Sequence, residues 1–412
     1  MNRKLAVAAL ALSAIFAGVA HAEDTLKIAH INPLSGPAAV VTERIARNLD
    51  YAVKTANANG GIGGKQVEVL SYDNKLSPEE TVVQAQKAID AGARLLMIGV
   101  SSPNSIALVD FVNKHNARNR DKKVLVLDVS SGDPVMVTSK CSYWSFLWVT
   151  NTDQQVTGMA GFLKQNPDIR KVYMLNPDSS SGRDFRSTVL SVFKSKVPEV
   201  RFVGDEMQPL LRVTDFAPYI AKIKASGADA VVSAEWGADL ALLLKAAGEA
   251  GLKAKWFTIY TTGPGAPTAI KQAGLSGLVY SIFDGDSGVQ NPDYMKVEAA
   301  VRQEYHQSAA PFPGVFAMIR ALKAAAEKAH STDPDKLVPA LEGSNVETLF
   351  GDQAVIRRAD HQFLAPIAIS SFGPLTAGEK FDEDGTGWGW RTVAREPAKD
   401  VTPAPACTMK RP

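Results

Sequence analysis

The sequence predicts an α/β protein built from two doubly wound parallel-sheet lobes. Three observations support this fold class. Short runs rich in β-branched residues alternate with segments of helical period, which is typical of βαβ units around a parallel sheet. The alternation occurs in two successive series. The length of 412 residues is enough for two domains of roughly 100 to 200 residues each.

The N-terminal segment 1–22 predicts a secretory signal peptide. Basic Arg3 and Lys4 precede the apolar run 5–20, and Ala20-His21-Ala22 supplies small residues for cleavage after Ala22. The apolar run is too short for a comfortable membrane span, and no Cys follows the cleavage site to carry a lipid. We therefore expect an exported, soluble protein that diffuses freely in the periplasm.

The net charge limits the classes of partner that the protein can have, and its two cysteines suggest a disulfide. A formal net charge of +2 gives no concentrated basic field, so we expect neither nucleic acid nor a membrane surface as a partner. The two cysteines, Cys141 and Cys407, are candidate disulfide partners in an oxidising compartment. Closing so long a loop would contribute about 5 kcal/mol in the entropy model. Two unpaired thiols are the alternative.

The first series of elements ends at Val129. Ser77 precedes Pro78 as a capping residue precedes a helix, and Pro103 stands at the favoured first turn of another. The glycine-rich segment 60–64 predicts a turn between a helix and a strand. The expected strands are 26–31, 65–73, 94–100 and 123–129, and the expected helices are 43–59, 78–91 and 103–115.

The second series begins after Trp148 and repeats the alternation. Its expected helices are 153–165, 184–195, 215–225 and 238–250, and its expected strands are 171–176, 201–208, 230–234 and 256–260. Beyond Gly277 the rhythm changes. We expect strands 278–283, 346–350, 367–372 and 388–394, helices 292–306, 313–329 and 335–341, and a hairpin turn at Asp384-Gly-Thr-Gly. The tail from Glu396 should run over the surface.

Two serine pairs follow neighbouring strands of the first series. Ser101 and Ser102 stand between a buried strand and Pro103, and Ser130 and Ser131 follow the next strand. Ligands of open α/β sheets bind beyond the carboxyl ends of the strands, where helix N-terminal N–H groups and hydroxyls can hold a carboxylate. The pairs therefore predict an anion cradle, with plain helix capping as the alternative.

Several motifs follow one another in an order and spacing that identify a family. They are the segment 28–37 (IAHINPLSGP), the segment 58–65 (ANGGIGGK) followed by a strand and Tyr72-Asp73, Ser101-Ser102, Asp215-Phe216, and the segment 247–252 (AGEAGL). Over nearly the whole mature chain, the sequence resembles the periplasmic leucine/isoleucine/valine-binding protein family, the solute receptors of branched-chain amino-acid ABC transporters.

The resemblance implies a type I periplasmic binding protein, in which three crossover strands join two lobes and the ligand binds in the cleft between them. On this template, lobe 1 comprises residues 23–147 and 281–347, lobe 2 comprises 148–280 and 348–395, and 396–412 form a C-terminal tail. In the family, the loop that contains Ser130 and Ser131 completes the carboxylate site. The partners implied are a small-molecule ligand and an inner-membrane ABC permease, with the protein itself a monomer.

The sequence departs from the family where an amino group would be bound. Family members that bind α-amino acids offer a hydroxyl at the position of Gly132, an aromatic residue at Ser181, and an acid in the region 260–262. Loss of the acid should weaken ammonium binding. We therefore expect an unaminated aromatic or aliphatic acid as the ligand, with a branched-chain amino acid as the alternative.

Other candidate residues each have a structural alternative. Trp236 could form a wall of the ligand site or pack between lobes, Arg183 could meet an anion or lie on the surface, and Glu235 could replace the missing acid or cap a helix. Phe283 and Asp284 fall near a crossover and could belong to the hinge. The expected ligand-binding residues are Ser101, Ser102, Ser130, Ser131, Ser181, Arg183, Trp236, Tyr260, Thr261, Phe283 and Asp284.

The sequence offers no set of residues for catalysis, a cofactor or a metal. The Gly-x-Ser-x-Gly pentapeptide of nucleophile elbows does not occur, and the loop 60–66 lacks phosphate-loop spacing. The histidines are dispersed, and Met295 stands where an EF-hand beginning at Asp284 would need Glu. We expect a solute-binding protein of an ABC importer that closes on its ligand. A ligand sensor for a signalling partner and an exported enzyme on the same fold are the alternatives.

Overall fold

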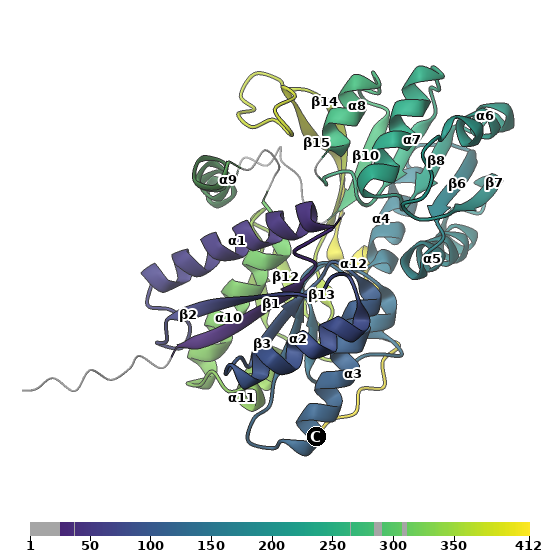
Figure 1. Ribbon diagram of the computed structural model, residues 1–412. Coiled ribbons are helices and arrows are strands. Elements are labelled where there is room, and N and C mark those ends of the chain that lie inside the picture. The colour runs from purple at the N-terminus through teal and green to yellow at the C-terminus, as the bar shows by residue number, and fades with distance from the viewer. Residues whose placement is uncertain (1–24, 37, 264, 284–290, 307–310) are drawn as a thin grey trace, which may run out of the picture.

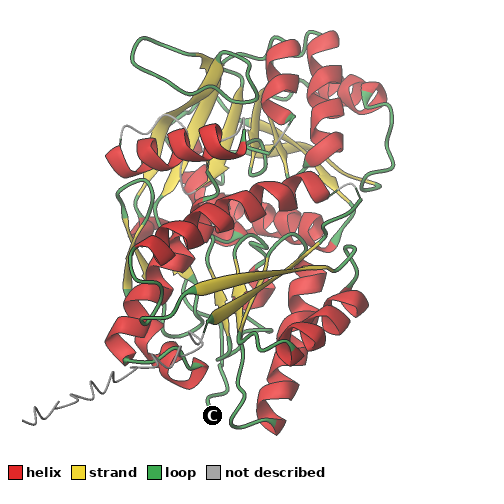
Figure 2. Ribbon diagram, turned by 60° about the vertical axis from the view of Figure 1, so that its left-hand side comes forward, coloured by secondary structure: helices red, strands yellow, loops and turns green. Residues whose placement is uncertain are grey.

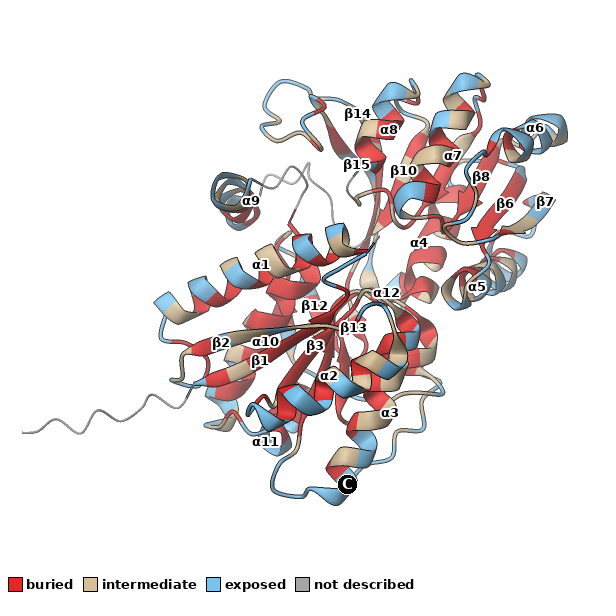
Figure 3. Cartoon of the chain, in the orientation of Figure 1, coloured by how far each residue is buried: buried red, intermediate tan, exposed pale blue. Residues whose placement is uncertain are grey.

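The computed structural model describes residues 25–36, 38–263, 265–283, 291–306 and 311–412, so the expected signal peptide and Asp284 lie outside the described residues. Two separate sheets, one parallel and the other mostly parallel, carry helices on both faces, which confirms the expected fold class (Figure 1). The turned view in Figure 2 shows both sheets covered by helices. The central strands of each sheet are buried while the outer faces of the helices are exposed (Figure 3).

The first sheet has five parallel strands in the order β2-β1-β3-β4-β5. The strands are β1 (Leu26–Asn32), β2 (Val67–Asp73), β3 (Leu95–Ile98), β4 (Leu125–Asp128) and β5 (Ser145–Leu147), and the helices around them are α1 (Ala39–Ala58), α2 (Pro78–Asp90), α3 (Ser102–Arg118), α9 (Pro292–Tyr305), α10 (Pro313–Ala329) and α11 (Pro334–Leu341). Strands β3 and β4 are buried along their whole length, as their continuous apolar runs predict.

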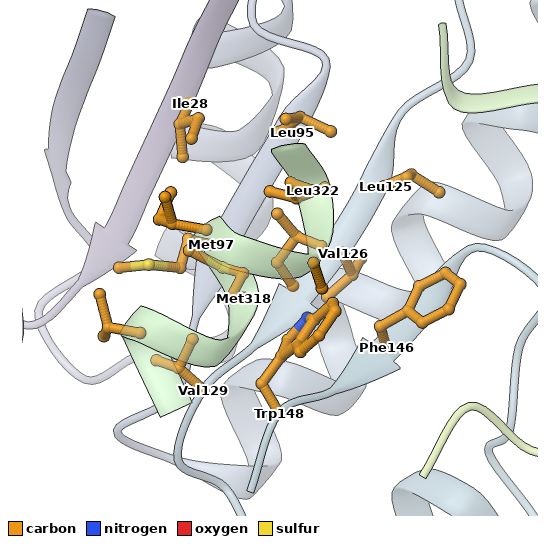
Figure 4. Close-up of a cluster of buried hydrophobic side chains, with 14 of the residues drawn as sticks. Ile28, Leu95, Met97, Leu125, Val126, Val129, Phe146, Trp148, Met318 and Leu322 are labelled. Atoms are coloured by element: carbon orange, nitrogen blue, oxygen red, sulfur yellow. The ribbon is translucent and has the colours of Figure 1, made fainter. Parts of the chain in front are cut away.

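The first core lies between this sheet and its helices. Met318 and Leu322 from α10 lie among Leu95, Met97 and Val126 from the central strands (Figure 4). All five side chains are fully buried. Burying such a side chain contributes roughly 1.5 to 3 kcal/mol, so this layer makes α10 part of the first lobe although its sequence lies far from strands β3 and β4.

The second sheet has seven strands in the order β15-β14-β10-β9-β8-β6-β7. Its strands are β6 (Lys171–Pro177), β7 (Arg201–Gln208), β8 (Ala230–Ser233), β9 (Lys255–Thr258), β10 (Val279–Phe283), β14 (Ile367–Pro374) and β15 (Trp388–Glu396), and its helices are α4 (Thr152–Lys164), α5 (Ser180–Lys196), α6 (Ala217–Ser226), α7 (Gly237–Glu249) and α8 (Ala266–Gln272). Strand β14 pairs antiparallel with both neighbours, so β15 closes this edge as a hairpin.

A small third sheet corrects the expected lobe boundary. Strands β11 (Asn345–Glu347), β12 (Gln353–Ile356) and β13 (Phe363–Leu364) form it, and the latter two were not expected. Ala354, Ile356 and Phe363 pack into the first core rather than the second. The chain therefore returns to the second lobe after Ala365, and not at the expected residue 348, because these apolar side chains are buried against the first lobe.

Three crossings of the chain lie close together between the lobes. The first leaves β5, where Leu147 forms a parallel bridge with Gln362 of the third crossing. The amide of Gln362 donates a hydrogen bond of 2.8 Å to the carbonyl oxygen of Val149. Phe283, at the end of β10, packs on the small cluster that contains Leu147 and Val149. The Phe283 side chain is therefore packed beside the crossings of the chain.

The C-terminal tail connects the two lobes a further time. After β15, the short helix α12 (Ala398–Val401) packs on α4 of the second lobe. The chain then passes the first lobe beside α3 (Figure 1), where Cys407 forms a disulfide with Cys141 across a Cα–Cα distance of 6.0 Å. The Arg411 guanidinium lies over the ring of Tyr143 and pairs with Glu342 at 2.8 Å.

We expect the double variant Cys141→Ser/Cys407→Ser to lose about 2 to 5 kcal/mol of unfolding free energy, because the disulfide closes a 266-residue separation in the unfolded chain. Urea unfolding of the variant and of the oxidised wild type would measure the difference. Wild-type protein treated with a reductant is the control, and it should behave like the variant. Equal midpoints for all three samples would contradict this expectation.

Candidate functional site

Asn32 holds the two serine loops of the first lobe together. It ends β1, and its Oδ1 atom accepts hydrogen bonds from the backbone N–H groups of Gly99 and Val100, each at 3.1 Å. A Cβ atom on Gly99 would come within 2.8 Å of the backbone nitrogen of Ser130, so only glycine allows this close approach. The loops after β3 and β4 are therefore neighbours, as parallel strand order predicts.

The serines form a hydrogen-bonded cluster rather than a set of helix caps. Ser101 is the N-cap residue of α3, but its side chain makes no capping hydrogen bond. The Ser102 hydroxyl donates to the carbonyl oxygen of Ser131 at 3.2 Å, and the hydroxyls of Ser105 and Ser131 lie 2.6 Å apart. Ser101 and Ser130 are half-buried and their hydroxyls make no hydrogen bond within the described ranges.

A buried aspartate fixes the second serine loop. The Oδ1 atom of Asp128 accepts hydrogen bonds from the backbone N–H groups of Ser130 at 3.1 Å and Ser131 at 2.8 Å. Burial raises the pKa of Asp128, while these hydrogen bonds act in the opposite direction. Gly132 follows with a left-handed φ of 57°, which favours glycine over the hydroxyl-bearing residue of the family.

In the second lobe, as in the first, an asparagine near the end of a strand accepts a hydrogen bond from the loop after the neighbouring strand. Asn176 in β6 accepts a hydrogen bond of 2.9 Å from the backbone N–H of Ala234, in the loop that leads to Trp236. Trp236 is the N-cap residue of α7 and is half-buried. Tyr260, half-buried, and Thr261, buried, follow β9 at the same edge of the sheet. These residues therefore stand at the carboxyl ends of neighbouring strands.

Helix α5 begins earlier than expected, which changes the position of two candidates. Ser179 caps it by accepting a 3.1 Å hydrogen bond from the N–H of Gly182, and its hydroxyl lies 3.2 Å from that of Ser181. Arg183 has a side chain that is 61% exposed and pairs with Asp178. The structure thus places Ser181 in the first turn of α5 and leaves Arg183 on the surface, which was its structural alternative.

Three carboxyl groups that the sequence did not single out affect one another's ionisation, because the charges of Asp133 and Asp153 act on Asp184. They are Asp133 in the loop after β4, Asp153 in the first turn of α4 and Asp184 in α5. Burial, together with the charges of Asp133 and Asp153, raises the pKa of Asp184 to about 7. Burial also raises the pKa values of Asp133 and Asp153. We call these three residues the acidic cluster.

Tyr260 is close enough to the acidic cluster to be affected by its charges. Burial and the charges of Asp133 and Asp184 raise the pKa of its hydroxyl to about 12. Helix α3, which carries the first serine pair, also contacts α5 of the second lobe. The described conformation therefore brings the serine loops, the acidic cluster and Tyr260 into one region. The sequence does not reveal the cluster, because Asp133 and Asp153 stand at helix starts, where acidic residues are common.

Glu235 does not join the acidic cluster. It is fully buried within the second lobe, where Gln208 donates hydrogen bonds to it at 2.8 Å and to Asp239 at 3.0 Å. Burial and the charge of Asp239 raise the pKa of Glu235 to about 8, against the effect of the Gln208 hydrogen bond. Asp239 also accepts the N–H of Leu211 at 2.6 Å. This network organises the ends of β7 and β8.

The described residues contain neither a candidate metal-binding group nor a helix that could span a membrane. Among them, no group of three or more His, Cys, Asp or Glu side chains is arranged to hold a metal ion. Within the same part of the chain, no helix is both long and apolar enough to cross a membrane.

A family model, a relative and a solved structure each match most of this chain. Residues 25–374 match the family model described as periplasmic binding protein. The "Leu/Ile/Val-binding protein homolog 4" of Brucella melitensis biotype 1 is 30% identical, over 98% of this chain and 97% of its own length. A closed leucine-, isoleucine-, valine-, threonine- and alanine-binding protein from Brucella ovis superposes with a TM-score of 0.83 at 27% identity, covering 94% of this chain and 100% of that one.

A structure with a different ligand shares the fold. A solute-binding protein of an ABC transporter from Rhodopseudomonas palustris BisB5, in complex with 3,4-dihydroxybenzoic acid, has a TM-score of 0.75 at 19% identity. The match covers 91% of this chain and 98% of the other. At this identity the likeness concerns the fold alone.

The acidic cluster predicts a pH-dependent stability of the ligand-free protein. The pKa of Asp184 is about 7 in the folded state, above the value of about 3.9 in an unfolded chain. The folded state therefore binds this proton more tightly, and its stability falls as the pH rises from about 4 to about 7. Asp184→Asn removes this effect, so we expect the variant to be more stable than wild type at pH 8, by about 1 kcal/mol after allowance for partial exposure.

Urea unfolding followed by tryptophan fluorescence at pH 8 and pH 5 measures this difference. The advantage of Asp184→Asn should shrink at the lower pH, where wild-type Asp184 is already protonated. Asp121→Asn, at an exposed position, is the matched control and should have no such pH dependence. An advantage of the same size at both pH values would show that ionisation of Asp184 is not its cause.

Proposed function

Because the chain belongs to the family of periplasmic binding proteins, which serve as the solute-binding components of ABC transporters, we propose that it captures an α-amino acid between its two lobes. The acidic cluster is the observation that carries this proposal. The relatives reported above are named as binding proteins, which supports capture rather than catalysis. The closed monomer would be the form that an inner-membrane permease accepts.

The serine loops suit the carboxylate end of such a ligand. Ser101 and Ser130 have hydroxyls that can donate, and the N-terminal N–H groups of α3 point from the same place. A carboxylate held in this way needs no buried counter-charge, because several N–H and O–H dipoles share its stabilisation. The two serine pairs would thus act together, with Ser102 and Ser131 fixing the loops that present the other two.

The acidic cluster suits the ammonium end. Burial first, and the charges of Asp133 and Asp153 second, raise the pKa of Asp184, so its charged form is disfavoured in the ligand-free protein. An ammonium group favours the charged form and supplies the hydrogen-bond donors that carboxylates require. One buried carboxylate oxygen of Asp184 has no hydrogen-bond partner in the described protein. A ligand with only a carboxylate would add a further negative charge here.

This proposal differs from the preference for an unaminated acid that the sequence suggested. That preference rested on the lack of a carboxylate in the segment 260–262. The cluster offers acids from other elements instead, and Tyr260 remains beside two of them. The dihydroxybenzoate-binding protein is too distant in sequence to argue for an aromatic acid here. Aromatic acids are therefore one arm of the test.

The decisive comparison uses pairs of ligands that differ only in the amino group. We expect thermal-shift and calorimetric titrations of refolded, ligand-free protein to detect leucine or phenylalanine but not 4-methylpentanoate or 3-phenylpropanoate. Asp184→Asn should weaken the binding of the amino acid by about 1.5 to 3 kcal/mol, since a charge-assisted hydrogen bond is lost. Asp121→Asn is again the control. Tighter binding of the unaminated partners, or of 3,4-dihydroxybenzoate, would overturn the proposal.

A further inference from the structure

The lobes meet a second time, away from the serine loops. The segment 375–387 connects β14 to β15 at the edge of the second sheet, and it extends towards α9 of the first lobe (Figure 1). Helix α9 belongs firmly to the first lobe, because Tyr294 is buried in the first core and the Tyr305 hydroxyl donates a hydrogen bond to Asp50 of α1. We call the segment 375–387 the hairpin loop.

A buried charge network joins α9 to the hairpin loop. The Arg302 guanidinium pairs with Glu298 of the same helix at 2.7 Å and lies 3.9 Å from Glu383 of the hairpin loop. It also lies over the ring of Phe381, 5.3 Å from its centroid. The Glu298 and Glu383 side chains are 0% exposed and that of Arg302 is 15% exposed. Charges so deeply buried are stable only when opposite charges face them.

A second arginine reaches across from α1. Arg44 is 8% exposed, and its guanidinium donates a 2.7 Å hydrogen bond to the carbonyl oxygen of Thr262 in the second lobe. On the other side of the same loop, Asp384 of the hairpin loop accepts hydrogen bonds from the N–H of Gly265 at 2.9 Å and the hydroxyl of Thr268 at 3.3 Å. The loop that carries Thr261 is thus held by both the first lobe and the hairpin loop.

We propose that the hairpin loop is a latch for the closed form, with Arg44 and Arg302 of the first lobe gripping Thr262 and Glu383 of the second. These are positioning residues, since they act on the loop after β9 and on the arrangement of the lobes rather than on the bound solute. When the lobes separate, the contacts of both arginines with the second lobe are lost. The latch therefore stabilises closure independently of which solute is bound.

The latch should act mainly on the release of a ligand. Its contacts form only after the lobes have come together, so their loss leaves the first encounter with the ligand unchanged and speeds reopening. Removing one charge from a buried pair is more harmful than removing an exposed one, because the remaining charge stays buried without compensation. Glu383→Gln keeps the shape of the side chain and removes only its charge.

The hairpin loop itself provides a matched control. Glu379 pairs at 3.0 Å with Arg391 of β15, so this ion pair lies wholly within the second lobe. Glu379→Gln removes a charge from the same loop without touching a contact between lobes. Arg44→Lys is a second latch variant, which keeps the positive charge of α1 and shortens the group that reaches Thr262.

Small-angle X-ray scattering of ligand-free protein tests the latch without any ligand. We expect Glu383→Gln and Arg44→Lys to shift the scattering towards a more open form with a larger radius of gyration, while Glu379→Gln matches wild type. Thermal unfolding of each variant checks that it is folded. Scattering of both latch variants that is identical to wild type would overturn the proposal, as would an equal shift in Glu379→Gln.

Stopped-flow fluorescence with leucine as the probe then measures the kinetic effect. Glu383→Gln should raise the dissociation rate roughly tenfold and leave the association rate unchanged. An unchanged dissociation rate would overturn the latch even where leucine binds. If wild type binds neither leucine nor phenylalanine, the proposed function fails, whereas the scattering experiment still decides on the latch.

Discussion

The site depends on two buried carboxamides, those of Asn32 and Asn176. Each stands near the end of the first strand of its sheet, and each accepts hydrogen bonds from the loop after the adjacent strand. A parallel sheet leaves the N–H groups of such loops without partners in the ladder, and burying them unpaired would cost about 1 to 3 kcal/mol each. The asparagines satisfy them and fix where each helix begins. The same arrangement therefore fixes the loop after a strand end in each of the two lobes.

The charge distribution shows how binding and stability oppose each other. The acidic cluster takes its members from three different elements, namely the loop after β4, the first turn of α4 and the start of α5. In the ligand-free protein this arrangement is unfavourable, because burial and like charge both disfavour ionisation. Binding sites for charged groups commonly lower the stability of the ligand-free protein in this way. A positive ligand group would convert the repulsion into attraction.

The long elements could be predicted because their patterns are local. Strands β3 and β4 are continuous apolar runs, and α2 has both a capping serine and a proline at its first turn. The short elements β12, β13, α8 and α12 carry too few residues for a period to emerge. Helix α5 was expected to begin at Asp184, whereas Ser179 caps it and the next two serines lie in its first turn.

The site could be predicted only in part for a related reason. The serine pairs were found because strand order brings neighbouring strand ends together within one lobe. The acidic cluster was missed because its members belong to both lobes and to a crossing, and no spacing in the sequence encodes their approach. Asp133 also accepts the N–H of Val135 at 2.9 Å, so locally it is an ordinary cap. Its effect on Asp184 depends on how the two lobes are arranged.

The contacts between the lobes are of two kinds. Some must persist when the lobes separate, and others must break. The crossings and the tail belong to the first kind: Arg357, close to the third crossing, donates a 2.6 Å hydrogen bond to the carbonyl oxygen of Pro403, and the disulfide follows four residues later. The latch belongs to the second kind, and it uses charges that water can solvate once the lobes part. Buried ion pairs are close to neutral in net free energy, unlike a covalent bond or an apolar core. Such contacts can therefore favour closure without making it irreversible, which release to a transporter requires.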